Sequence, residues 1–106
     1  MSIILQQPRH DTLGHDALAM AIGRELRRRR RAAHLTQREV GDPFTRAFVC
    51  AVERGRALPS IAALAILLQR LDVRLDEFFS GVQEDMTIQY TAAHGHRQKA
   101  SSRRRR

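Results

Sequence analysis

The sequence predicts an all-α fold, with five helices packed into one compact domain over residues 17–80. Apolar residues recur every three or four positions, the spacing that places side chains on one face of a helix. Residues suited to helix N-caps precede the shorter apolar segments, and glycine or proline follows several of them. The length of 106 residues allows one domain. We therefore expect residues 1–16 to be a flexible segment and residues 81–106 to be a basic, mostly disordered tail.

The first predicted helix covers residues 17–33, which are mostly good helix formers. Leu18, Ile22 and Leu26 recur every four residues and form an apolar stripe. Five arginines follow one another at residues 27–31. Successive side chains are about 100° apart around a helix, so these arginines point in different directions. We expect most of them to face solvent.

The second predicted helix is short and begins after Thr36. This threonine is a good N-cap, and Glu39 three residues later completes a capping box. Val40 is its expected core residue. The segment Gly41-Asp42-Pro43 contains strong helix breakers, so the helix ends there.

The third predicted helix covers residues 47–54, with Thr45 as the candidate N-cap. Val49 and Val52, three residues apart, are expected to point inward. Gly55 follows, at the position where a helix C-terminus favours a left-handed residue.

The fourth predicted helix is capped by Ser60 and is apolar on more than one side. Ala62 and Ile66 lie one turn apart on its second side, which needs a cover. Either a second subunit covers this side, or residues 3–5 fold back onto it. The apolar face that packs on the core comprises Ile61, Leu64, Leu67, Leu68 and Leu71.

A short fifth helix is predicted over residues 75–79, and Gly81 is expected to close the domain. Apolar and polar residues alternate over residues 86–91, which is a weak strand signal.

The net charge of +8 favours a polyanionic partner, of which nucleic acid is the commonest. No apolar stretch approaches the ~20 residues of a membrane helix, so we expect a cytoplasmic protein without membrane contact. Cys50 is the single cysteine, which excludes an internal disulfide. His94 and His96 lack a third partner in the sequence, so we expect no metal and no cofactor. No nucleophile with a base, carboxylate pair or phosphate loop is evident, and we expect no enzyme activity.

Short helices joined by a tight turn can present one helix to the major groove of DNA. The whole ordered set, over residues 18–79, resembles the lambda-repressor-like, Xre-type helix-turn-helix family. The matching residues are Ile22-Gly23, Leu26-Arg27, Arg30, Leu35-Thr36-Gln37, Glu39-Val40, Phe44-Thr45-Arg46, Phe48-Val49, Val52-Glu53-Arg54-Gly55-Arg56, Pro59-Ser60, Leu64, Leu71, Val73 and Leu75-Asp76-Glu77-Phe78. The segment between Val40 and Glu53 is shorter than is usual in the family.

The resemblance implies a sequence-specific, DNA-binding transcriptional regulator with a recognition helix at about residues 45–54. Arg46 is the best candidate for a base contact, because arginine pairs with guanine through two hydrogen bonds. A phosphate contact or a solvated side chain is the alternative for Arg46. Ala47 and Ala51 match family positions that face base edges, although alanine also serves simply as a helix former.

Four further residues are expected at DNA phosphates. The resemblance implies that Gln37 contacts a phosphate through its side chain and backbone N–H. Thr45 is first a cap that can also reach a phosphate, and Arg54 and Arg56 follow the recognition helix. An ordinary exposed glutamine is the alternative for Gln37. One or two of the arginines at residues 27–31 are also expected near a phosphate.

Arg30 and Glu53 match a buried ion pair that ties the first helix to the third in the family; two unrelated surface charges are the alternative. The expected partners are double-stranded DNA and a second copy of the chain. Two other functions stay open: a protein-interaction module on the same fold, such as an antitoxin or adaptor, and a non-specific nucleic-acid-binding protein that uses the tail. The apolar outer face of the third helix keeps the first of these in view.

Overall fold

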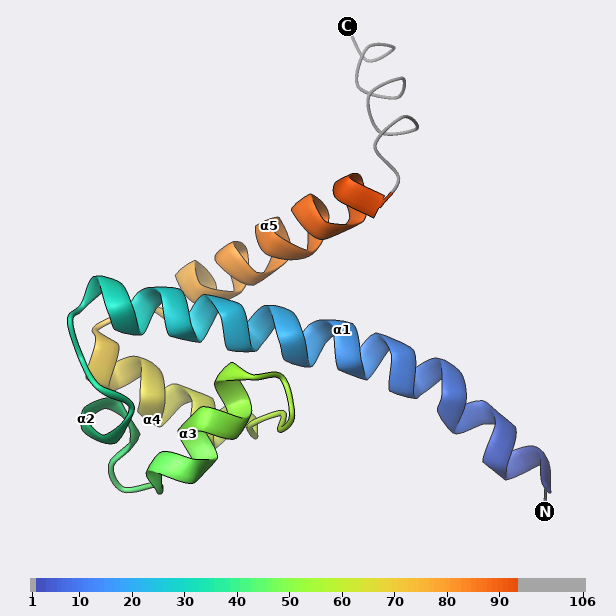
Figure 1. The fold of residues 1–106 in the computed structure, drawn as a ribbon, viewed down its shortest axis with the longest axis horizontal. Coiled ribbons are helices and arrows are strands. Elements are labelled where there is room, and N and C mark those ends of the chain that lie inside the picture. Colours follow the sequence, from blue (N-terminus) through green and yellow to red (C-terminus); the bar gives the residue numbers. More distant parts are fainter. Residues whose placement is uncertain (1, 94–106) are drawn as a thin grey trace, which may run out of the picture.

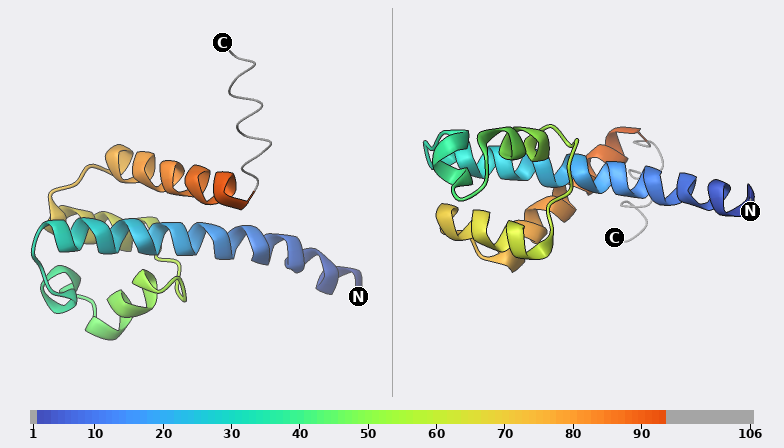
Figure 2. Two further views of the ribbon diagram at one scale, coloured as in Figure 1. Left: turned by 45° about the horizontal axis from the view of Figure 1, so that its top comes forward. Right: turned by 90° about the horizontal axis from the view of Figure 1, so that it is seen from below.

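The structure, a computed structural model, describes residues 2–93, with side chains from residue 15 onward. Within these residues it contains five helices and no strand, so the all-α prediction is confirmed. The helices are α1 (Ser2–Ala32), α2 (Gln37–Gly41), α3 (Arg46–Glu53), α4 (Ile61–Leu71) and α5 (Leu75–Ala93). The long helix α1 lies between α5 on one side and α3 on the other (Figures 1 and 2). None of the described helices combines the length and the apolar character that crossing a membrane requires.

One hydrophobic core joins all five helices. Phe78 at the start of α5 is completely buried in it, and so is Leu26 of α1. Burying a side chain of this size stabilises a fold by about 1.5–3 kcal/mol. The other large members of the core are Ile22, Val40, Val49, Val52, Leu64, Leu67, Leu68, Leu71 and Val82.

All three predicted N-caps are confirmed. The Thr36 hydroxyl accepts a hydrogen bond from the Glu39 backbone N–H at 3.1 Å, and the Glu39 carboxylate accepts one from the Thr36 N–H at 2.8 Å. The hydroxyls of Thr45 and Ser60 each accept from the backbone N–H three residues onward, at 3.1 and 3.0 Å. Gly55 has a φ of +75°, as predicted for the end of α3. These local signals fix where the short helices begin and end.

Helix α1 begins at Ser2, whereas the sequence predicted a flexible segment over residues 1–16 and a helix start at Ala17. A single glycine such as Gly14 costs a helix only about 1 kcal/mol relative to alanine. Extending an existing helix is also far easier than starting one. The N-terminal end of α1 points away from α4, so residues 3–5 do not fold back onto it (Figure 1).

Helix α5 continues to Ala93, and both the predicted end at residue 79 and the predicted strand over residues 86–91 are wrong. Gly81 does not end the domain but lets α5 approach α1, because a Cβ added there would lie 2.3 Å from a carboxylate oxygen of Glu25. Val82 and Asp85 beyond it are buried, so the domain extends past residue 80. The remainder of the predicted tail, residues 94–106, lies outside the described part of the chain.

Helix α4 packs on the core with the predicted leucines, but Ile61 does not join them. Its side chain is 65% exposed, because the first turn of α4 extends past the edge of the core. Ala62 and Ile66, on the predicted second side, are also exposed. This side of α4 therefore has no cover within the described chain.

Candidate functional site

Helices α2 and α3 form one packed unit. Val40 of α2 and Val49 of α3 are both fully buried, and the two helices contact each other directly. The rings of Phe44 and Phe48 lie 5.2 Å apart, centroid to centroid, and fill the turn between the helices. Phe48 thus packs against the turn, and the turn holds the start of α3 in a fixed orientation.

The two sides of α3 have opposite environments. Val49, Val52 and Glu53 are buried toward α1 and the core. On the other side Arg46 and Ala47 are exposed, and Ala51 is half-buried. The three residues predicted to contact bases therefore all belong to α3, and the two at its N-terminal end are open to solvent.

An ion pair joins the inner side of α3 to α1. Arg30 and Glu53 make two hydrogen bonds, from Nε to Oε2 at 2.6 Å and from Nη2 to Oε1 at 3.0 Å. The side chains are only 12% and 2% exposed. The hydrogen bond to Glu53 raises the pKa of Arg30 above its usual value, although burial acts in the opposite direction. The structure thus brings together the two residues that the resemblance pairs.

Gln37 is tied to the same carboxylate, a contact that the sequence analysis missed. Its side-chain nitrogen donates to Glu53 Oε1 at 3.1 Å. Arg30 donates in addition to the backbone carbonyl of Leu35 at 2.8 Å. In this arrangement the Gln37 side chain links the first turn of α2 to α3, rather than pointing freely into solvent. The spacing of 16 residues between Gln37 and Glu53 gives no periodic signal, so the sequence could not reveal this bond.

A basic hollow of about 520 Å³ opens between the N-terminal ends of α2 and α3. Arg38 and Arg46 on its rim are exposed and form no ion pair with any residue of the described chain. Sequence reasoning overlooked Arg38. The residues lining the hollow are Arg30, Thr36, Gln37, Arg38 and Arg46.

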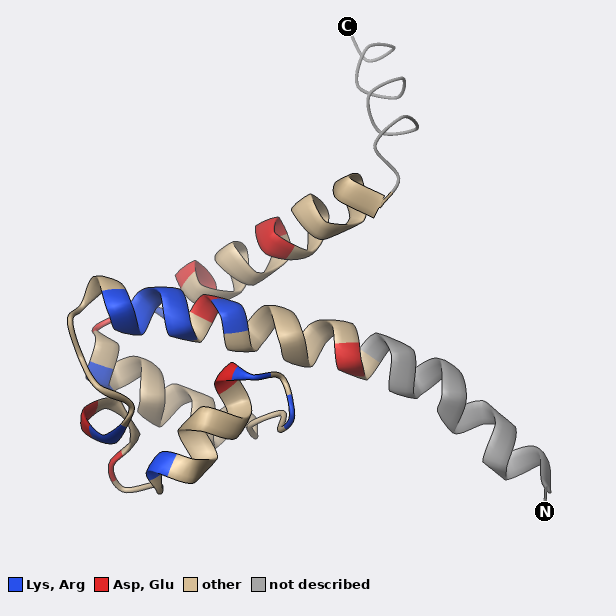
Figure 3. Ribbon diagram, viewed as in Figure 1, with Lys and Arg blue, Asp and Glu red and all other residues tan. Residues whose placement is uncertain are grey.

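Three other predicted phosphate contacts lie around α3. Thr45 is exposed, with its hydroxyl engaged as the N-cap. Arg54 and Arg56 are exposed at the opposite end of α3, away from the lining of the basic hollow. Figure 3 shows basic residues at the start of α3, just after its end and along the second half of α1.

Comparison of the chain with models of known protein families and with curated proteins finds no match in either set.

Proposed function

We propose that the protein is a sequence-selective, DNA-binding transcriptional regulator of the helix-turn-helix type, with a lambda-repressor-like arrangement of its five helices. The observation that carries the proposal is the outer side of α3. Its N-terminal residues Arg46 and Ala47 are exposed, while its inner side is held by the core and by Glu53. A helix presented in this way fits the major groove, which is about 12 Å wide.

The basic hollow supports the same function. Exposed Arg38 and Arg46 lie beside the N-cap residue Thr36 and have no acidic partner in the described chain. Arginines that lack a carboxylate partner are available for phosphate oxygens, and phosphate contacts position a protein on a duplex. In this proposal Arg46 reads a base, Ala47 and Ala51 approach thymine methyl groups, and Thr45, Arg54 and Arg56 lie along the backbone. The side-chain nitrogen of Gln37 already donates to Glu53. In this proposal Gln37 therefore contacts a phosphate through its backbone N–H and through the side-chain N–H that Glu53 does not bind.

Substitution of Arg46 tests this assignment. Arg46→Ala is expected to weaken binding to a selected site by about 1–3 kcal/mol, while binding to bulk DNA changes far less. Competition titrations with labelled selected duplex and unlabelled bulk duplex measure both affinities. The matched control is Arg74→Ala, which removes an exposed arginine immediately before α5. It is expected to leave the ratio of the two affinities, for selected and for bulk duplex, unchanged. An equal loss on both duplexes would show that Arg46 contacts only the backbone.

A protein-interaction module on the same fold is the second candidate. Leu58 before α4 and Ile61 and Ile66 within it are exposed apolar side chains. Exposed apolar surface, where it is contiguous, marks binding sites for other proteins. Purification of a stable complex with another protein, together with no enrichment of any DNA sequence, would favour this second function. Equal affinity for all duplexes would instead favour a non-specific nucleic-acid-binding protein.

A further inference from the structure

Four arginines of α1 share one face of the helix. Arg24, Arg27, Arg28 and Arg31 follow the spacing i, i+3, i+4, i+7, which places side chains above one another. They alone line a shallow surface hollow of about 490 Å³. We call these four residues the arginine face. From the sequence, the arginines at residues 27–31 are expected to point in different directions around the helix. Arg24 is not among them, and it extends the set to a complete face.

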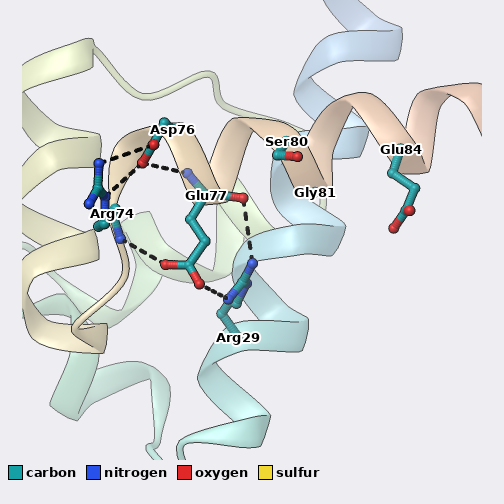
Figure 4. A pocket seen from close by; sticks show the side chains of 7 residues that line it. All are labelled: Arg29, Arg74, Asp76, Glu77, Ser80, Gly81 and Glu84. Carbon is teal, nitrogen blue, oxygen red and sulfur yellow. Dashed lines mark hydrogen bonds and ion pairs between the residues drawn. The ribbon is translucent and has the colours of Figure 1, made fainter.

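The remaining arginines of the segment have structural partners elsewhere. Arg30 is held by Glu53 on the side of α3. Arg29 bonds Glu25 at 2.8 Å and reaches Glu77 at the start of α5 (Figure 4). Arg29 lines a pocket at the start of α5, in which the carboxylates of Asp76, Glu77 and Glu84 offset the charges of Arg29 and Arg74. On the arginine face only two of the four side chains have a carboxylate partner.

Two members of the arginine face are anchored and two are not. Arg24 pairs with the buried carboxylate of Asp85 at 2.8 Å, and Arg28 pairs with buried Glu25. Arg27 and Arg31 are exposed and form no ion pair with any described residue. The anchored pair stays in place, so that a ligand meets part of the face already ordered, and ordering is a main cost of binding.

The arrangement is unfavourable for the isolated helix. Like charges at i,i+3 and i,i+4 repel and destabilise a helix, and the arginine face contains four such pairs. Arginines that served only for solubility gain nothing from this crowding. An anion that bridges several guanidinium groups removes the repulsion.

The arginine face is separate from the reading end of α3. A Cβ added to Gly23 on α1 would lie 2.3 Å from the backbone oxygen of Val52, so α1 crosses the C-terminal end of α3. Arg46 lies at the other end of that helix, about 10 Å away, because seven steps of about 1.5 Å separate it from Glu53. The hollow lined by Arg46 and the hollow lined by the arginine face share no residue.

We propose that the arginine face is a second, sequence-independent binding site for the phosphate backbone of double-stranded DNA. The seven steps from Arg24 to Arg31 span about 10 Å along α1, and phosphates of one strand follow each other at about 3.4 Å along the duplex axis. The face can therefore contact two or three successive phosphates. Guanidinium groups suit phosphate oxygens because they offer paired N–H donors. The inference shares its partner with the proposed function but depends on a different surface.

The test compares two double variants of the full-length protein on bulk duplex over a range of salt concentrations. Arg27→Gln with Arg31→Gln removes the two unpaired members of the face. Arg70→Gln with Arg74→Gln removes the same charge from exposed positions elsewhere. The first variant is expected to lower the slope of log affinity against log salt by about 2, since each phosphate contact contributes about 0.9. It should also melt no lower than wild type, because it relieves repulsion. The second variant is expected to leave the slope unchanged.

An equal change of the salt slope in both double variants would show that only net charge matters, and would overturn the proposal. An unchanged slope in the first variant, with sequence selectivity intact, would overturn this inference and leave the proposed function standing. A protein that binds no duplex at all would contradict both. A parallel titration with vesicles of anionic lipid provides the last arm: loss of vesicle binding without any change in DNA binding would assign the face to a membrane surface instead.

Discussion

Glu53 of α3 links α1 and α2 to its own helix. Its carboxylate accepts hydrogen bonds from Arg30 and from Gln37, and its own side chain is 2% exposed. A buried carboxylate with this set of donors fixes the angle between α1 and the α2–α3 unit. For these individual residues, the sequence predicted the Arg30–Glu53 pair only through its resemblance to the helix-turn-helix family. The Gln37 contact, and the burial of Glu25 and Asp85 between α1 and α5, follow no pattern that a single sequence displays.

Removing the Glu53 side chain leaves Arg30 buried without a counter-charge. Breaking a buried pair on one side costs about 3–5 kcal/mol, and Glu53→Ala is expected to lower the free energy of unfolding by that amount. Urea denaturation followed by circular dichroism measures it. Glu84→Ala, at an exposed position of α5, is the control and should stay within about 0.5 kcal/mol of wild type. An unchanged midpoint in Glu53→Ala would show that the pair contributes nothing to stability.

Helix boundaries followed from the sequence where local chemistry decides them. Thr36, Thr45 and Ser60 cap the helices that they were predicted to cap, because a cap depends only on residues three positions apart. The extent of α5 did not follow, since Gly81 looks like a helix end in the sequence. Its reason for being glycine is Glu25, which is 56 positions earlier in the chain and only becomes a neighbour in the fold.

Gly23 provides the test at the scale of helix packing. Alanine favours a helix interior over glycine by about 1 kcal/mol, so Gly23→Ala should stabilise α1 in isolation. In the protein its Cβ would approach backbone atoms of Val52 and Glu53 to between 2.3 and 2.9 Å, and backbone cannot yield without moving α3. We expect a net loss of about 1–3 kcal/mol in thermal or chemical unfolding. Ser80→Ala, at an exposed position of α5, is the comparison variant. A gain in stability for Gly23→Ala would contradict the close packing of α1 on α3.

Among the apolar surfaces that the described residues leave exposed, the second side of α4 is one that a dimer on a paired DNA site would bury. Ala62 and Ile66 of α4 are exposed. The N-terminal end of α1 projects away from α4 (Figure 1). We propose that a homodimer through this side of α4 covers them. Such a dimer is expected to place its two α3 helices roughly 34 Å apart, which is one turn of DNA.

The dimer makes a direct prediction for light scattering. Wild-type protein at tens of micromolar is expected to have the mass of two chains, and Ile66→Asp the mass of one, because a buried charge opposes association. Gln83→Asp, at an exposed position of α5 rather than α4, should remain dimeric. Wild-type protein that is already monomeric at this concentration would exclude the dimer without any variant.

Selection from a pool of random DNA duplexes tests the central claim, sequence reading by α3, most directly. The wild-type protein is expected to enrich one motif strongly, as two half-sites with centres about 10 base pairs apart. Arg46→Ala should lose the preference for guanine at one position of each half-site and keep the remainder of the motif. A pool that stays random after repeated rounds of selection with folded protein would contradict the claim.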